Sequence, residues 1–119
     1  MSTPELKAIL HQLHSKTSDL YLSMIIAPDG LLVCHEGNVE DPELCGAYFL
    51  ELKIVAEKII NELHFGDIEE IFIRSKSGCV TILPIFEKGY LACMSSPNLN
   101  SGKLQMLGWS AISKLYTLL

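Results

Sequence analysis

Residues able to carry out chemistry are few in this chain, and their spacing assembles no known catalytic motif. A phosphate-binding loop requires Gly-x-x-x-x-Gly-Lys-[Ser/Thr], but the only Gly-Lys pair, Gly102-Lys103, is followed by Leu104 and has Pro97 in place of the first glycine. The nucleophile elbow, the zincin motif and the dinucleotide-binding glycine motif do not occur either. We therefore expect no catalytic residue and no cofactor, and we interpret the protein as a non-enzyme.

Histidine and cysteine residues could bind a metal ion, but their pattern does not favour one. His11 and His14 would share one face of a helix, yet no carboxylate is spaced to join them. The cysteines include no Cys-x-x-Cys pair, and each stands in an apolar stretch, at Cys34, Cys45, Cys79 and Cys93. We expect no metal site, solvent-facing histidines, and small buried thiols in a reducing compartment.

Arg74 is the only arginine, and so the only candidate for an arginine finger acting on a GTPase. The alternation with Phe72 favours a different role, that of an edge-strand charge which discourages aggregation. Glu69 and Glu70 are adjacent and would point to opposite faces of a strand, so they are not expected to act as a carboxylate pair.

Length and composition indicate one domain and limit the class of partner. A chain of 119 residues with 49% hydrophobic residues suits a single domain over residues 1–119. It has no apolar run of membrane-spanning length and no basic leader, so we expect a soluble, cytoplasmic protein. The net charge of −5 disfavours nucleic acid and anionic lipid. The mean hydropathy of +0.30 is high for a small monomer and predicts apolar surface buried against another chain.

The hydrophobic pattern predicts helices and strands in the order α-ββ-α-βββ-α. Helices are predicted from a cap at Ser2 or Thr3 to about Ser15, from Pro42 to about His64 with Gly66 as the C-cap, and after Pro97. Strands are predicted over 20–27, 31–35, 68–75, 79–86 and 90–95. Pro84 should lie near a strand end, and Gly108 should let the last helix approach its sheet closely.

The helix predicted over 42–64 has more apolar surface than one sheet needs. One wide apolar face runs from Cys45 through Phe49 to Leu63 and suits packing on a sheet. A second, narrower stripe is formed by Ala47, Leu50 and Ile54, and it is flanked by the charged residues Glu51, Lys58 and Glu62. Because a helix on a single sheet needs only one apolar face, the second stripe predicts a protein partner.

This ordered set of features resembles the roadblock/dynein light chain family, which includes the MglB-type regulators of Ras-like GTPases. The resemblance covers almost the whole chain and rests on the order of elements, the hairpin over 27–33, the helix closing at Phe65-Gly66, the hairpin from Leu83-Pro84 to Gly89-Tyr90-Leu91, and the segment 97–104. It implies a profilin-like α/β/α sandwich with a five-stranded antiparallel sheet of order 2-1-5-4-3. The first and third helices would cover one face of this sheet, and the second helix the other.

The resemblance also implies a homodimer in which the third strands pair edge to edge and the second helices lie side by side. The residues at that interface would be Ala47, Leu50, Ile54, Ile68, Ile71 and Ile73. On the platform made by the paired helices, Leu50, Glu51, Ile54, Lys58 and Glu62 would contact a partner. The implied function is a non-catalytic regulator or scaffold for a small Ras-like GTPase, in a GTPase-activating or adaptor role, or for a motor-type complex.

The alternative function is a small-molecule sensor of profilin-like or PAS-like shape. Such a domain encloses its ligand between sheet and helix and needs a cavity with a few convergent polar groups. The sheet-facing positions here are apolar, and the only polar groups available to a ligand would be the hydroxyls of Tyr21, Tyr48 and Tyr90.

Overall fold

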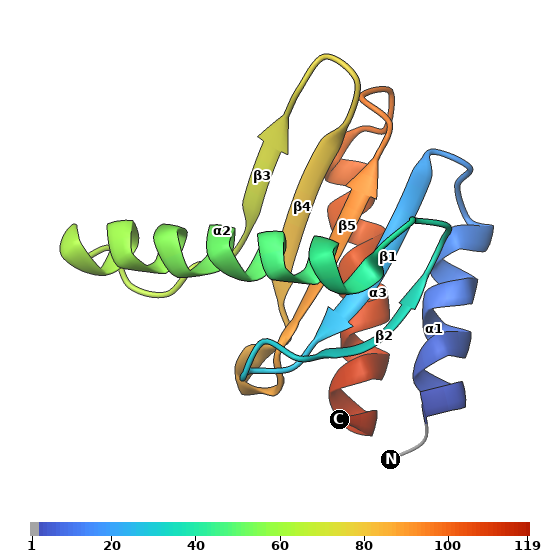
Figure 1. Cartoon of the computed structure of the whole chain (residues 1–119), viewed down its shortest axis with the longest axis horizontal. Helices are drawn as coiled ribbons and strands as arrows, with labels where there is room; N and C mark the ends of the chain where they lie inside the picture. The colour runs from blue at the N-terminus through green and yellow to red at the C-terminus, as the bar shows by residue number, and fades with distance from the viewer. Residues whose placement is uncertain (1–2) are drawn as a thin grey trace.

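The computed structural model describes residues 3–119, which form three α-helices and one five-stranded sheet (Figure 1). The helices are α1 (Thr3–Ser15), α2 (Pro42–Glu62) and α3 (Ser101–Leu118). The strands are β1 (Leu20–Ile26), β2 (Leu32–Glu36), β3 (Ile71–Arg74), β4 (Cys79–Pro84) and β5 (Tyr90–Ser95), and the short 3-10 helix η1 (Phe86–Lys88) joins the last two. The predicted order of elements is confirmed.

The sheet is antiparallel throughout, with strand order β2-β1-β5-β4-β3, as the resemblance implied. At one edge, β3 pairs only with β4, from Ile71 opposite Ile82 to Arg74 opposite Cys79. The prediction of a strand over 68–75 was too long, because residues 68–70 approach the sheet without pairing. The prediction over 79–86 was also too long: β4 ends at Pro84, which has no N–H to donate to a ladder.

Two apolar layers hold the helices to the sheet, α1 and α3 on one face and α2 on the other (Figure 1). On the first face, Leu6 and Leu10 of α1 and Leu115 of α3 are fully buried against the sheet. Gly108 lies where an added Cβ would be 2.5 Å from Leu83 Cδ1, so the predicted close approach of α3 is confirmed. On the second face, Phe49 of α2 packs among sheet residues that include Leu22, Met24 and Tyr90.

The start of α2 follows its predicted signal, and the start of α3, for which the sequence specified no cap, is now defined. Asp41 caps α2 by accepting a hydrogen bond from the N–H of Leu44 at 3.1 Å, and proline follows it. Asn100 caps α3 by accepting from the N–H groups of Gly102 and Lys103. For α1, Thr3 is already helical and is not the cap, while a cap at Ser2 lies outside the described residues.

The end of α2 differs from the prediction. The last helical residue is Glu62, and His64, rather than Gly66, takes the first left-handed conformation after it, with φ of 57°. The N–H of Phe65 donates to the carbonyl of Ile60, and the N–H of His64 donates to that of Asn61, both at 3.1 Å. These paired bonds form a Schellman motif, so the helix closes before the glycine is reached.

The long helix α2 crosses the sheet and continues past its edge. In Figure 1 its N-terminal half lies in front of the strands, and its C-terminal turns extend beyond β3. Only Gly46 and Phe49 of α2 are buried. Its last turns therefore project past the sheet of their own chain, whereas Lys53, in the middle of the helix, still lies over Tyr90 of β5.

Candidate functional site

The three α2 residues predicted to form a dimer interface differ in exposure. Ala47 is exposed, and Ile54 keeps 55% of its surface accessible, as expected for a free apolar stripe. Leu50 is half-buried, because its methyl groups pack on the β1–β2 turn; a Cβ added to Gly30 would be 2.6 Å from Leu50 Cδ2. Leu50 thus contributes to the fold of its own chain, and the predicted stripe is narrower than the sequence indicated.

The three predicted isoleucines around β3 also divide into two kinds. Ile68 and Ile71 are half-buried, and Ile71 packs against the apolar layer beneath α2. Ile73 is 44% exposed on the same face of the strand. Of the three isoleucines, Ile73 has the most exposed side chain.

An exposed apolar surface lies where sequence analysis expected a buried face. Tyr48, Val55, Ile59 and Leu63 belong to the wide apolar face of α2, yet each is more than half exposed, at 60%, 55%, 53% and 52%. A groove of about 420 Å³ leads from Tyr48 across to Ile73. We name Tyr48, Val55, Ile59, Leu63 and Ile73 the α2–β3 apolar surface. Periodicity itself places Tyr48 and Val55 about 100° and 120° from the buried Phe49 around the helix, at the border of the wide face. For Ile59 and Leu63 it gives no warning, because it does not say where the sheet beneath the helix ends.

The charged residues predicted to contact a partner all lie on one exposed side of α2. Glu51, Lys58 and Glu62 are exposed and spaced at i, i+7 and i+11, so they line up along the helix. A different pair, Lys53 and Glu57, forms an ion pair at 2.8 Å on the opposite flank. The charged row therefore runs beside the α2–β3 apolar surface.

Arg74 is held by its own chain. Its Nη1 donates a hydrogen bond of 2.7 Å to the carbonyl of Pro97, and its guanidinium lies 5.4 Å from the ring centre of Phe72. Both contacts would have to break before the side chain could reach a second protein. This geometry favours the edge-strand role over the arginine-finger role.

The two glutamates before β3 do not act together, as expected. Glu70 is half-buried and its Oε2 accepts a hydrogen bond from Nε2 of Gln105 in α3, while Glu69 is exposed. The two acids therefore lie in different environments.

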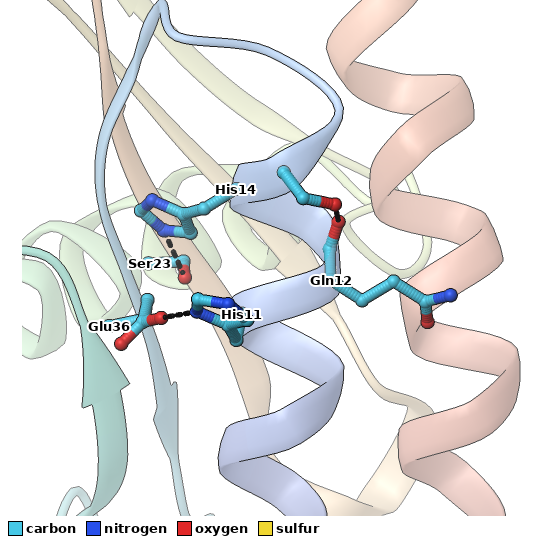
Figure 2. Close-up of polar contacts among 6 residues, drawn as sticks. His11, Gln12, His14, Ser23 and Glu36 are labelled. Atoms are coloured by element: carbon cyan, nitrogen blue, oxygen red, sulfur yellow. Dashed lines mark hydrogen bonds and ion pairs between the residues drawn. The ribbon is translucent and has the colours of Figure 1, made fainter.

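A polar cluster joins α1 to the first two strands (Figure 2). His11 Nδ1 lies 2.6 Å from a carboxylate oxygen of Glu36, and His14 Nε2 lies 2.8 Å from Oγ of the buried Ser23. One sequence prediction was wrong here, because His14 is half-buried rather than solvent-facing. Strand β2 brings Glu36 from a distant part of the chain to His11, but His14 bonds to Ser23 instead.

Burial of His14 makes the stability of the fold depend on pH. Burial lowers the pKa of His14 below 6.5, although Glu36 acts to raise it and His11 to lower it further. The unfolded chain then takes up the proton first, so the free energy of unfolding falls as pH drops below about 6.5. We expect His14→Gln to reduce this fall, measured by urea unfolding at pH 7.5 and 5.5. The exposed His64, replaced by Asn, is the matched control; an equal reduction in both variants would contradict the role of His14.

Two of the four thiols, Cys34 and Cys93, are unsuited to chemistry at neutral pH. All four cysteines are free; Cys34, Cys79 and Cys93 are buried and Cys45 is half-buried. Burial raises the pKa of Cys34 and raises that of Cys93 to about 12, which keeps both protonated. Within residues 3–119, no three histidine, cysteine or acidic side chains come together to hold a metal ion.

Two open grooves flank α2, one of about 420 Å³ beside Tyr48 and one of about 690 Å³ beside Glu57. The sensor alternative expects an enclosed cavity with convergent polar groups. Of its expected polar groups, Tyr90 is fully buried, while Tyr21 and Tyr48 face solvent at 48% and 60% exposure. These three hydroxyls therefore do not surround one ligand site.

Comparison with known families decides the class of the domain. Residues 6–95 match the sequence model of the Roadblock/LC7 domain. The chain belongs to the Roadblock/LC7 domain family. No curated protein sequence matches it significantly.

Solved structures share the fold of this roadblock domain at low sequence identity. Myxococcus xanthus MglB superposes with a TM-score of 0.88 at 9% identity, covering 98% of this chain and 89% of that one. A Roadblock/LC7 domain from Streptomyces avermitilis gives 0.86 at 12% identity, covering 93% and 94%. LokiProfilin2, solved with rabbit actin, gives 0.62 at 19% identity over 100% of both chains, in agreement with a profilin-like sandwich. Across residues 3–119 of the roadblock domain, no helix is long and apolar enough to span a bilayer.

Proposed function

We propose that residues 1–119 form a single roadblock domain that acts as a homodimeric, non-catalytic regulator or scaffold in the cytoplasm. Its partner is a small Ras-like GTPase or a motor-type complex. The observation that carries this proposal is the α2–β3 apolar surface, which lies exposed beside a sheet edge that β4 pairs on one side only. Within a single protomer, the apolar surface stays in contact with water and the outer edge of β3 stays without a paired strand.

A second copy of the chain suits both features at once. The outer edge of β3 presents backbone N–H and C=O groups that another β3 can pair with, which would extend the sheet across the two copies. A two-fold axis at that edge would bring the overhanging C-terminal half of each α2 over the partner's sheet (Figure 1). The dimer would then bury Val55, Ile59 and Leu63. Together with Tyr48, these side chains are the four most exposed of the α2–β3 apolar surface, and they would form the centre of the interface.

The paired α2 helices would present the charged row to a third protein. Glu51, Lys58 and Glu62 remain exposed and lie on a different side of α2 from the wide apolar face, so dimerisation would leave them accessible. Ile54, at 55% exposure beside them, adds an apolar contact. Since Arg74 is bound to Pro97, any stimulation of GTP hydrolysis would act by positioning groups of the GTPase itself.

Co-elution with a GTPase tests the proposed function. Purified Ras-like GTPases from the same genome, each loaded with GDP or with a non-hydrolysable GTP analogue, are mixed with the protein and separated by size exclusion. We expect one GTPase to co-elute in one nucleotide state, and Glu51→Lys with Glu62→Lys to weaken the complex at least tenfold while the dimer persists. Glu5→Lys with Glu40→Lys, two exposed acids outside the platform, should leave it unchanged. Absence of any complex in both nucleotide states would contradict the GTPase as partner.

A further inference from the structure

A second surface, distinct from the α2–β3 apolar surface, has the features of a binding site. A groove of about 690 Å³ runs between α2, the segment 66–69 that leads into β3, and the β4–β5 connection. Its α2 wall carries Glu57 and Asn61, and helical spacing puts these residues on the flank opposite Tyr48, Val55 and Ile59. The groove is formed by residues of one protomer, and Ile68 and Ile71, which the sequence first assigned to the dimer interface, are part of its lining.

The walls of the groove are strongly acidic. Four acids line it, Glu57, Asp67, Glu69 and Glu87, against one base, Lys53. Lys53 is already neutralised, because its Nζ is 2.8 Å from Glu57 Oε1 and lies 5.1 Å from the ring centre of Tyr90. Asp67 and Glu69 are exposed and form no ion pair within residues 3–119. The charge left uncompensated at the rim is therefore negative.

Two aromatic side chains stand at the same rim. Phe86 is 74% exposed and Trp109 is 57% exposed, which is unusual for such large apolar groups. Phe86 is held outward by its backbone, whose φ of 48° is rare for a non-glycine residue, and by an edge-to-face contact with Tyr116 at 5.3 Å. Backbone strain of this kind that displays a ring to solvent is a feature of binding surfaces.

The floor of the groove is aliphatic, with Ile60, Ile68, Ile71 and Ile82 among its residues. Acids, exposed aromatic rings and an aliphatic floor together match the lysine and arginine side chains, whose methylene stems pack on apolar surface while the cation meets carboxylates and ring faces. We propose that this groove binds a lysine- or arginine-bearing segment of a partner polypeptide. The partner is recognised by its positive charge and not by the dimer platform.

The test uses the single tryptophan as the reporter, since Trp109 lies at the rim. The probe is the peptide acetyl-Ala-Arg-Leu-Lys-Ala-amide, titrated into the full chain at low salt while Trp109 fluorescence and amide chemical shifts are recorded. We expect saturable binding, with shifts at 66–69 and 86–89, that weakens as salt is added. The charge-reversed peptide acetyl-Ala-Glu-Leu-Glu-Ala-amide should bind at least tenfold more weakly.

Two pairs of variants distinguish binding in the groove from non-specific attraction of a basic peptide to an acidic protein. Asp67→Asn with Glu69→Gln should weaken the basic peptide roughly tenfold, the upper range for losing two exposed ion pairs. Glu40→Gln with Glu43→Gln removes the same charge at the other end of α2 and should have little effect. Equal weakening in both pairs, equal binding of the two peptides, or shifts confined to residues outside the groove would overturn the proposal. If the protein proves to be a monomer and still binds the basic peptide in the groove, the binding proposal is supported and the proposed homodimer is contradicted. Failure of one proposal can therefore be distinguished from failure of the other.

Discussion

Replacing both Ile59 and Ile73 by lysine is expected to convert the protein from a dimer into a folded monomer. Each copy would contribute both substitutions, so four positive charges would meet across the interface in place of apolar contacts. Loss of two interface residues per copy, one of them at the centre, costs on the order of 4 kcal/mol or more, which raises the dissociation constant by roughly a thousandfold. Both side chains are about half exposed in the protomer, at 53% and 44%, so the fold itself should persist. Size exclusion with light scattering measures the outcome.

The control replaces two apolar residues that are more exposed than Ile59 and Ile73 but lie elsewhere. Leu31, at 68% exposure in the β1–β2 turn, and Met106, at 72% exposure on α3, are changed to lysine together. This variant should remain dimeric. Leu50 and Ile71, to which the sequence first pointed, are poorer test sites because both are half-buried within their own chain. A double Ile59/Ile73 variant that stays dimeric would show that the interface lies on another surface.

Replacing Gly89 by alanine is expected to destabilise the fold by about 3 kcal/mol or more, because the added methyl group meets both an unfavourable backbone conformation and a backbone atom. Gly89 has φ of 128°, which side-chain-bearing residues rarely adopt, and an added Cβ would lie 2.2 Å from the carbonyl oxygen of Ile26. Because that oxygen belongs to the backbone of a central strand, it has no room to move. Urea unfolding followed by circular dichroism gives the change in the free energy of unfolding.

Gly66 provides the comparison for this variant. Its φ of 89° is also left-handed, but an added Cβ would meet no atom within 4 Å. Gly66→Ala should therefore show only the conformational cost, about 1 kcal/mol. If Gly89→Ala lost no more stability than Gly66→Ala, this would contradict the close approach of Gly89, in the β4–β5 connection, to the backbone of Ile26 in β1.

Much of the fold could be predicted because local signals and tertiary packing agree. Asp41-Pro42 starts α2, Pro84 ends β4, and Gly108 marks the close approach of α3 to Leu83. Strand order is a different matter, since no local pattern specifies which strands are neighbours. That order came from the resemblance to the roadblock family.

The candidate site was predicted only in part, for a geometric reason. Helical periodicity grouped Ile59 and Leu63 with Phe49 on one wide apolar face, about 80° and 40° from it around the helix. What periodicity lacks is the length of the sheet beneath: Phe49 lies above strands, whereas the C-terminal turns of α2 extend past β3 (Figure 1). The contact of His11 with Glu36 was missed for a similar reason. It forms because the fold brings β2 next to α1, and the residues around His11 and around Glu36 do not predict that approach.

The central claim is that a second copy of this chain covers the α2–β3 apolar surface, and the solution mass tests it most directly. Sedimentation equilibrium of the unmodified protein, over concentrations from about 1 to 100 μM, would give the mass and the dissociation constant; an interface of this kind should hold at micromolar concentration or below. We expect twice the 13.2 kDa of one chain across most of that range. A mass of one chain at the highest concentration would contradict the claim.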